Sequence, residues 1–365
     1  MEPDAIRNPA RRDWRNWRWQ LRHSRPAPRT LERLAGIAPR DRRRWRALLR
    51  RYPCRITPYY GALVRWDDPA DPLRRQCLPD LAELDTPAPG GADPLGEHAH
   101  LVAPGLVQRY PDRALALTTG DCALFCRHCT RKNLWQYGRP APTRGFLRRL
   151  AAAVARRPAV REVIVSGGDP LLLDDDRLDA FLAALRAIPH VEVLRIGTRA
   201  PAVLPMRITP ALCARLARHR PLWINTQFNH PRELTPEAAE ACGRLVRAGL
   251  PVSNQAVLLR GVNDDLDTLK ALCNGLQRLS VRPYYLFQCD AVRGAGHFST
   301  PWRRGIELAE RLRAELGGLS APLFVADLPG GGGKVPLLRS PILSLSEHRA
   351  VLRGHDGRRR TLTRP

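Results

Sequence analysis

Apolar residues in the middle of the chain form short runs that alternate with longer amphipathic stretches. Six short runs predict β-strands, at 114–118, 162–166, 191–197, 222–227, 252–258 and 283–287. Leu178, Phe181, Leu182, Leu185 and Ile188 share one face of a helix between two of them. Strands that alternate with amphipathic helices are typical of parallel βα units.

Local signals place the ends of several predicted helices. Thr209-Pro210 and Thr235-Pro236 each combine an N-cap residue with proline at the first helical position, and Gly249 ends the second helix. A sixth helix is expected near 306–316, followed by a strand at 323–326. Six units are too few for a closed eight-unit barrel, so the sequence predicts an α/β fold with an incomplete (β/α)6 barrel. Its active site should lie at the C-terminal ends of the strands.

We expect three regions along the chain. Residues 1–105 are rich in Arg, Trp and Pro and form an N-terminal helical region, with helices near 29–34 and 40–50. Residues 106–320 form the partial barrel. Residues 321–365 form a C-terminal segment with a β-rich tail. Trp14 and Trp17, three residues apart, favour packing of a helix on the core over stacking with nucleic-acid bases.

The charge of the chain is strongly positive, and its distribution limits what this implies. The formal net charge is +25, from 60 Lys+Arg against 35 Asp+Glu. Lysine occurs only at positions 132, 270 and 334, so nearly all of the excess is arginine, and it runs through the whole chain. A nucleic-acid surface would concentrate this charge. The arginine excess therefore indicates a general bias of the coding genome in amino-acid usage and argues against nucleic acid as a partner.

The sequence also contains no apolar run of about 18 residues and no signal-like segment near its start. Its nine cysteines, three of them close together, fit a metal site and buried thiols better than a disulfide framework. We therefore expect a cytoplasmic protein that does not enter the membrane.

Three cysteines follow the first predicted strand in the segment TTGDCALFCRHCTRKN. Cys122, Cys126 and Cys129 can hold three corners of a 4Fe-4S cluster and leave the fourth iron open for S-adenosylmethionine (SAM). The alternative is structural zinc, with His128 near the cysteines. Zinc sites usually pair two such knuckles, and no second one is present, so the spacing favours the cluster.

The segment SGGDP follows the second predicted strand. Gly167 and Gly168 allow a ligand to approach the backbone closely, and Asp169 comes next. The alternative is an ordinary turn before a helix. The position at the end of a barrel strand favours the ligand interpretation.

A lysine follows four glycines near the C-terminus. Pyridoxal phosphate (PLP) is held as an imine by a lysine, and Lys334 is the candidate because a bendable glycine run delivers it to the barrel mouth. A flexible surface loop with an incidental lysine is the alternative. A phosphate-binding loop is excluded, because Leu328 and Val335 stand where glycine and Ser/Thr are required.

At this point the sequence closely resembles the lysine 2,3-aminomutase family over nearly its whole length. The resemblance is carried by DWRNWRWQL, APGLVQRYPDRAL, the cysteine loop, SGGDPLLL, RIGTRAP, INTQFNHPREL, NQAVLLRGVND, RPYYLFQCD and DLPGGGGKVP. It implies a radical SAM isomerase that also uses PLP. The roles it implies are PLP attachment for Lys334, cluster ligation for the three cysteines, SAM contact for the SGGD segment and Gln255, PLP phosphate contact for Arg109 and Arg113, and α-carboxylate binding for Arg131.

The resemblance also implies a substrate. Asp290 and Asp327 correspond to the positions that grip the far end of lysine, and two carboxylates suit a buried ammonium. The prediction is interconversion of L-lysine and β-lysine. Arginine is the main alternative, since a guanidinium also pairs with carboxylates and Gln227 stands where the lysine enzymes have histidine. A further relative of this family acts on a lysine side chain of a translation elongation factor. That substrate is less favoured, because the C-terminal motif of that relative lacks the full PGGGGK run.

Partners follow from the same resemblance. The enzyme needs an electron donor such as flavodoxin or ferredoxin. A homo-oligomer is also expected, but without the inter-subunit zinc of the family, because no cysteine follows Cys289. The non-enzymatic alternative is an Arg-rich nucleic-acid-binding protein with a structural iron-sulfur cluster.

Overall fold

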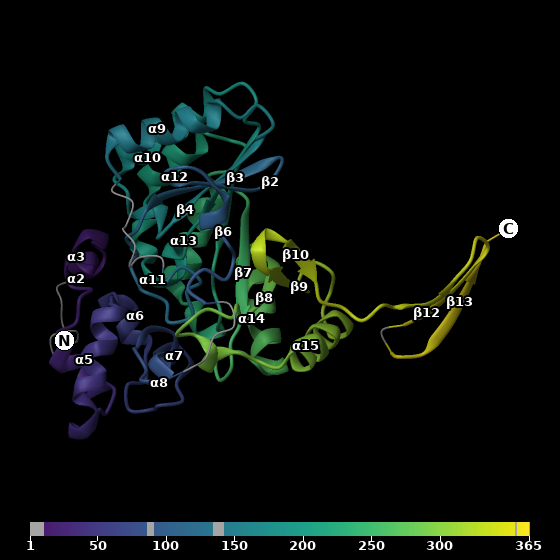
Figure 1. The fold of residues 1–365 in the computed structure, drawn as a ribbon, viewed down its shortest axis with the longest axis horizontal. Helices are drawn as coiled ribbons and strands as arrows, with labels where there is room; N and C mark the ends of the chain where they lie inside the picture. The colour runs from purple at the N-terminus through teal and green to yellow at the C-terminus, as the bar shows by residue number, and fades with distance from the viewer. Residues whose placement is uncertain (1–10, 86–90, 134–141, 355, 365) are drawn as a thin grey trace.

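The computed structural model describes residues 11–85, 91–133, 142–354 and 356–364. Its centre is a ten-stranded sheet whose strands follow one another in chain order (Figure 1). The strands are β1 (Leu101–Ala103), β2 (Leu106–Tyr110), β3 (Arg113–Thr119), β4 (Glu162–Gly167), β5 (Val193–Gly197), β6 (Leu222–Thr226), β7 (Val252–Leu258), β8 (Arg282–Gln288), β9 (Leu323–Leu328) and β10 (Gly333–Pro336).

Strands β3 to β9 are parallel, and a helical connection joins each to the next. The crossover helices are α9 (Arg144–Ala155), α10 (Asp175–Arg186), α12 (Pro210–Ala217), α13 (Pro236–Arg247), α14 (Leu266–Arg278) and α15 (Trp302–Glu315), with the short α11 (Ala200–Val203) before α12. Six βα units followed by β9 confirm the predicted incomplete barrel.

The two predicted N-caps are confirmed. The Thr209 side chain accepts from the Leu212 amide and the Thr235 side chain from the Ala238 amide, so both are N-caps. One strand is shorter than predicted: β5 begins at Val193, because the Val191 amide closes a turn onto the Ile188 carbonyl.

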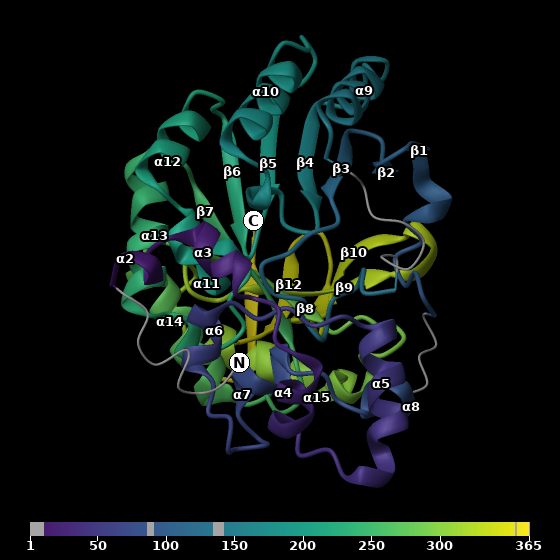
Figure 2. The same ribbon diagram turned by 90° about the vertical axis from the view of Figure 1, so that its left-hand side faces the viewer.

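The sheet curls, with its helices on the outer face (Figure 2). Ala114, Val163 and Leu194 face outward and are buried, whereas their neighbours in the next register row, Leu115, Ile164 and Arg195, are half-buried. The inner, concave face therefore keeps some accessible surface.

Side chains from opposite ends of the sheet meet across this hollow. β2, near one edge, supplies Tyr110, whose hydroxyl accepts a hydrogen bond of 3.0 Å from the Lys334 amide of β10, at the other edge. The Arg109 guanidinium, also from β2, forms an ion pair with the Asp327 carboxylate of β9. β1 and β10 remain the edges of the ten-stranded ladder in the described part of the chain, so side chains rather than backbone pairing bring the ends together.

The N-terminal region is helical, as predicted. Its helices are α2 (Arg11–Trp14), α3 (Trp17–Arg22), α4 (Pro28–Leu34), α5 (Arg42–Arg51), α6 (Pro58–Leu63), α7 (Pro72–Cys77) and α8 (Ala82–Asp85). Trp14 and Trp17 pack against the main core, as expected from their spacing. The sheet begins with β1, a few residues before position 105, where we expected the helical region to end.

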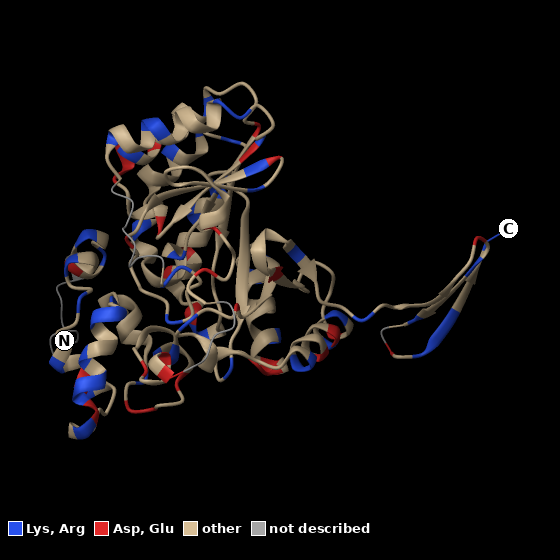
Figure 3. Ribbon diagram, in the orientation of Figure 1, with Lys and Arg blue, Asp and Glu red and all other residues tan. Residues whose placement is uncertain are grey.

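The C-terminal tail is a second sheet of β11 (Ile342–Leu345), β12 (Arg349–Arg353) and β13 (Arg359–Thr363). It extends away from the body of the molecule (Figure 1). Basic residues occur on the N-terminal helices, the barrel helices and this tail alike (Figure 3). Among the described residues, no helix is both long and apolar enough to cross a membrane.

Candidate active site

The loop with the three cysteines begins directly after β3 and is anchored by the N-terminal region. The Phe125 amide donates to the Arg55 carbonyl at 3.2 Å, and the Arg127 amide donates to the Gln76 carbonyl at 3.0 Å. The Arg55 guanidinium also donates to the Cys122 carbonyl at 2.9 Å. The stretch before α6 and helix α7, both far away in sequence, therefore hold the backbone of this loop on both sides of Cys126.

A buried charge cluster fixes the same loop. Glu83 of α8 accepts from Arg127 at 2.8 and 2.5 Å and from the Lys132 ammonium at 2.8 Å. Burial acts to raise the pKa of Glu83, but the charges and hydrogen bonds of Arg127 and Lys132 outweigh it and lower the pKa to about 2. Glu83 is thus ionised at neutral pH, and it ties the second half of the cysteine loop, through Arg127 and Lys132, to α8.

The three thiols are close enough to affect one another. Burial raises the pKa of Cys122 well above its usual value, with further contributions from Cys129, Asp169 and Cys126. No three His, Cys, Asp or Glu side chains in the described ranges are arranged to hold a single metal ion. Three neighbouring thiols are the ligands that a 4Fe-4S cluster uses at three of its corners.

Arg199, after β5, donates to the Cys126 sulfur at 2.8 Å. Its other terminal nitrogen donates to Gln76 at 2.6 Å and to Glu233 at 2.7 Å. This buried guanidinium places positive charge beside a thiol that must be a thiolate to bind iron. His128, the alternative zinc ligand, is instead within 3.2 Å of the Gln227 side-chain nitrogen and 3.3 Å of that of Asn229.

The SGGDP segment packs directly on the start of the cysteine loop. A Cβ at Gly168 would lie 2.2 Å from the Asp121 carbonyl oxygen, and one at Gly167 would lie 2.4 Å from that of Thr119. Asp169 accepts from the Thr198 hydroxyl at 2.7 and 2.9 Å and from the Arg199 amide at 2.9 Å. Packing between loops is therefore sufficient to require the glycines, and Asp169 braces the end of β5.

Lys334 lies on β10, reached through the glycine run. Gly331 has φ +86°, and a Cβ there would lie 2.1 Å from the His100 ring, so this position requires glycine. The Lys334 ammonium is 3.3 Å from each oxygen of Asp327 and 5.5 Å from the centre of the Phe287 ring. Four glycines thus allow β10 to turn back along β9 beside the concave face.

The other two lysines are already engaged. Lys132 is buried and donates to Glu83 and to the carbonyls of Arg127 and Gly294, at 2.8, 2.9 and 2.7 Å. Lys270 pairs with Glu315 at 2.7 Å on the helical surface. Neither ammonium faces the hollow in which Lys334 lies.

Asp327 lies between two cations, and Asp290 lies close by. Arg109 approaches Asp327 at 3.5 Å, and its Nε is buried without a hydrogen-bond partner. The pKa of Asp290 is raised to about 7, chiefly by burial and then by the charge of Asp327, while Lys334 and Arg109 act to lower it. The structure therefore brings Lys334, Arg109, Asp290 and Asp327 together in one cluster of charged side chains, called the charged pocket below.

Arg131, predicted to bind a carboxylate, already has a carboxylate partner. Its Nε and Nη2 donate to the two oxygens of Glu97 at 2.8 and 2.5 Å. This bidentate pair uses one edge of the guanidinium and leaves Nη1 for a ligand. The Glu97 amide in turn donates to Asp93 at 3.0 Å.

The remaining predicted residues lie on the inner side of the curl or near its rim. Arg113 begins β3, where its guanidinium lies over the Tyr110 ring at 3.8 Å, and it pairs with Asp112 at 3.3 Å. Gln255 is half-buried on β7. Both lie on strands of the same curled sheet, on either side of the hollow.

Sequence reasoning missed Glu83, Glu97, Arg199 and the role of Arg55. Each lies 30 or more residues from its partner in the site, so no local pattern marks it. One signal was available: Glu83 and Glu97 are carboxylates in a chain with a large excess of arginine, and both precede the cysteine loop.

Comparisons with known proteins agree with this geometry. The family model described as the radical SAM superfamily matches residues 117–272, and the one described as lysine-2,3-aminomutase matches residues 309–365. An L-lysine 2,3-aminomutase of Fusobacterium nucleatum is 42% identical over 353 residues, 97% of this chain and 83% of the relative. One of Clostridium subterminale is also 42% identical, over 97% of this chain and 85% of the relative. A glutamate 2,3-aminomutase of Clostridioides difficile is 35% identical over 97% of this chain and 84% of the relative.

Proposed function

Because the chain belongs to the lysine 2,3-aminomutase family of radical SAM enzymes, we propose that it interconverts L-lysine and β-lysine with the help of a 4Fe-4S cluster, SAM and PLP. The reaction moves an amino group between neighbouring carbons, so the enzyme is an isomerase. The observation that carries the substrate assignment is the pocket of Asp290, Asp327, Arg109 and Lys334.

When bound, the cluster would supply the electron that splits SAM into methionine and a 5′-deoxyadenosyl radical, and PLP would supply a carrier for the migrating nitrogen. Cys122, Cys126 and Cys129 would hold the cluster. The SGGD segment and Gln255 would contact SAM. The chain's remaining task is to hold the substrate still and to exclude water from the radical.

Lys334 is the proposed attachment point for PLP. Its ammonium contacts Asp327 in the cluster with Asp290 and Arg109, whereas Lys132 is buried against Glu83 and Lys270 pairs with Glu315 on the helical surface. Arg109 fits the cofactor phosphate, because its buried Nε has no partner in the described protein. Arg113, on the adjacent strand, would add a second positive charge at the phosphate.

Charge balance in this pocket favours a cationic side chain. Attachment of PLP at Lys334 would remove this ammonium from Asp327, and the carboxyl groups of Asp290 and Asp327 would then have Arg109 as their remaining basic neighbour among these residues. A substrate ammonium restores the balance, whereas the side chain of glutamate would add a third negative charge. Arg131, held by Glu97 along one edge, would bind the α-carboxylate through Nη1.

A comparison of substrates tests the proposal. The protein is reconstituted anaerobically with iron, sulfide, SAM and PLP, reduced, and supplied in parallel with lysine, arginine, glutamate and a lysine-bearing elongation factor. We expect β-lysine and no product from glutamate. Turnover of arginine or of the protein substrate without turnover of lysine would overturn the substrate assignment and leave the radical chemistry in place.

We also propose a cytoplasmic location and a homo-oligomer. All nine cysteines, each within the described residues, are free, as expected in a reducing compartment.

The homo-oligomer is supported by exposed apolar residues of the projecting tail sheet, where a second copy could cover Ile342, Leu345 and Leu362. Light scattering of the intact chain and of a Leu345→Glu/Leu362→Glu variant tests the assembly. A monomeric wild-type protein would contradict it.

A further inference from the structure

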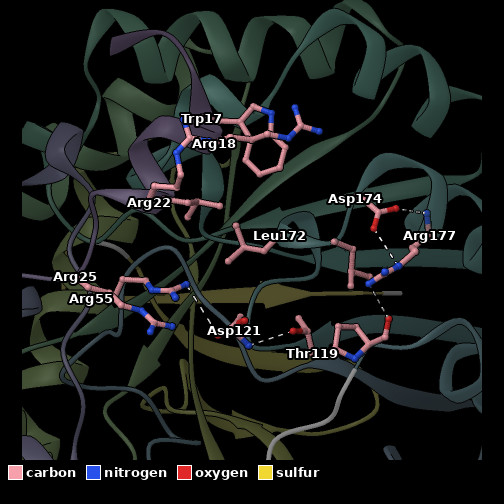
Figure 4. A pocket seen from close by; sticks show the side chains of 13 residues that line it. Trp17, Arg18, Arg22, Arg25, Arg55, Thr119, Asp121, Leu172, Asp174 and Arg177 are labelled. Carbon is pink, nitrogen blue, oxygen red and sulfur yellow. Dashed lines mark hydrogen bonds and ion pairs between the residues drawn. The ribbon is translucent and has the colours of Figure 1, made fainter. Parts of the chain in front are cut away.

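A hollow of about 580 Å³ lies on the outer side of the cysteine loop (Figure 4). It is separate from the charged cluster of Lys334 and is formed by several parts of the chain. These are α3 with the turn that follows it, Arg55 before α6, the end of β3 with Asp121, Pro142, and the segment from Leu172 to the start of α10. Trp17 and Leu172 supply apolar surface to its wall.

Arginine dominates the polar lining of this hollow. Five arginines from these and neighbouring segments converge on it, namely Arg18, Arg22, Arg25, Arg55 and Arg177. Two carboxylates lie among them, and Asp174 is paired with Arg177 at 3.1 Å. Asp121 is 4.0 Å from Arg55. The five positive charges thus exceed the negative charges of the lining.

The three arginines of the first segment differ from those on most barrel helices. Within the described ranges, Arg18, Arg22 and Arg25 form no ion pair, and all three are exposed. On α13 and α15, by contrast, Arg244 pairs with Glu240 and Arg311 pairs with Glu315. These two arginines thus have carboxylate partners, whereas the three at the hollow have none in the described ranges, as is also true of Arg148, Arg149 and Arg156 on and just after α9.

The floor of the hollow reaches the cysteine loop. Thr119 and Asp121 line it, and Asp121 immediately precedes Cys122. Arg55, also in the lining, donates to the Cys122 carbonyl at 2.9 Å. This basic surface therefore adjoins the backbone of Cys122, a proposed cluster ligand.

We propose that this hollow and its arginine rim form the docking surface for an acidic one-electron carrier protein. The proposal rests on the proposed function, which requires one electron to enter the cluster before SAM is cleaved. In the docked complex the carrier loses one electron and the cluster gains one, and no bond is made or broken. Charge complementarity raises the rate of encounter and orients the carrier with its redox group toward Cys122.

The placement of the arginines favours a protein over a small phosphate-bearing ligand. A small anion is normally held by convergent, buried donors, whereas Arg18, Arg22, Arg25 and Arg177 lie exposed around the rim. Of the five, Arg55 is the buried one, and it is committed to the cysteine loop. An exposed ring of like charge with some apolar surface suits the acidic face of another protein.

Charge reversal tests the surface. The variant Arg18→Glu/Arg22→Glu/Arg25→Glu is compared with Arg148→Glu/Arg149→Glu/Arg156→Glu, which makes the same charge change at three exposed arginines on and just after α9. Anaerobic stopped-flow bleaching of the reconstituted cluster is followed with fully reduced flavodoxin at low and high salt. A small reductant, photoreduced deazariboflavin, is used in parallel.

We expect the first variant to be reduced by flavodoxin at least about tenfold more slowly at low salt and to lose most of the salt dependence. The α9 variant and all reactions with deazariboflavin should match the wild type. Equal slowing in both variants would overturn the proposal. Slower reduction of the first variant by deazariboflavin would also overturn the proposal. So would an unchanged flavodoxin rate accompanied by lost binding of pyrophosphate in calorimetry, because that result would mark a small-anion site.

The failure of this inference can be told apart from failure of the proposed function. Lysine turnover driven by deazariboflavin does not involve docking and tests the function alone. Cluster bleaching by flavodoxin does not involve lysine and tests the surface alone.

Discussion

The cysteine loop after β3 is held by buried charges, whereas Lys334 lies on the short edge strand β10. In the loop, Glu83 and Arg127 have side chains that are 0% and 2% exposed, and their hydrogen bonds join the loop to α8. Lys334 is 32% exposed and follows glycines that adopt left-handed conformations. The difference fits two different tasks. A group that forms a radical needs fixed geometry, whereas a lysine that exchanges its bond with a substrate needs room to move.

The most severe test of the movable region is Lys334→Ala. We expect the imine absorbance of bound PLP to disappear and the aminomutase rate to fall by roughly a thousandfold or more, because no other lysine lies in the charged pocket with Asp290 and Asp327. Absorption spectra and anaerobic turnover measure the two effects. Lys270→Ala, which removes an ammonium paired with Glu315, should retain both. An imine band that survives in Lys334→Ala would move the attachment point elsewhere.

The fixed region is tested by Glu83→Gln. The change leaves Arg127 and Lys132 buried without their counter-charge, which should lower the free energy of unfolding by about 3–5 kcal/mol. We expect a lower melting temperature and less iron per chain, measured by calorimetry and metal analysis. Glu315→Gln, at an exposed pair, should match the wild type.

The same residue gives the loop a dependence on acid. The folded pKa of Glu83, about 2, lies below its ordinary value of 4.5, so its contribution to stability is complete above pH 4.5 and is lost as the pH falls toward 2. Glu83→Gln should therefore lose most of its disadvantage in this pH range. A constant difference between variant and wild type at all pH values would contradict the role given to the ionised carboxylate.

Glu97→Gln tests whether the region around Arg131 is also fixed in advance. The neutral amide can accept at only one of the two positions now used by Arg131, so the guanidinium should lose its orientation. We expect the KM for lysine to rise by about tenfold, with a smaller change in kcat. Glu192→Gln, which weakens an exposed pair with Arg161, serves as the control. A fall in kcat at unchanged KM would argue against a role in binding the carboxylate.

The smallest expected effect is a pH dependence in the pocket of Lys334. The pKa of Asp290 is raised to about 7, so below that pH the side chain is mainly neutral and cannot attract an ammonium. The KM for lysine should fall by about tenfold between about pH 6 and pH 8, as the carboxylate ionises. Asp290→Asn should bind lysine more weakly and lose this inflection. If the inflection persists in the variant, another group titrates.

Local sequence determined most of the fold. Alternating apolar runs identified all six barrel strands, and Thr209 and Thr235 cap the helices that they were expected to begin. β1, β2 and β10 were missed because each has only three to five residues, and β10 contains glycine and proline, which strands rarely use. Cys122, Cys126 and Cys129 could be proposed as ligands from sequence because a cluster loop needs its ligands within a few residues. Lys334 could be proposed because lysine is rare in this chain.

Only the tertiary structure decided how these groups are held. The partners of Arg127, Arg131 and Cys126 lie on other elements, and a side chain carries no sequence signal of which distant element it will meet. The meeting of Tyr110 with Lys334 depends on the accumulated curl of the whole sheet. Periodicity and spacing act within one strand, helix or loop. The charged pocket and the anchored cysteine loop instead arise from contacts across the fold, which form only when the complete chain packs.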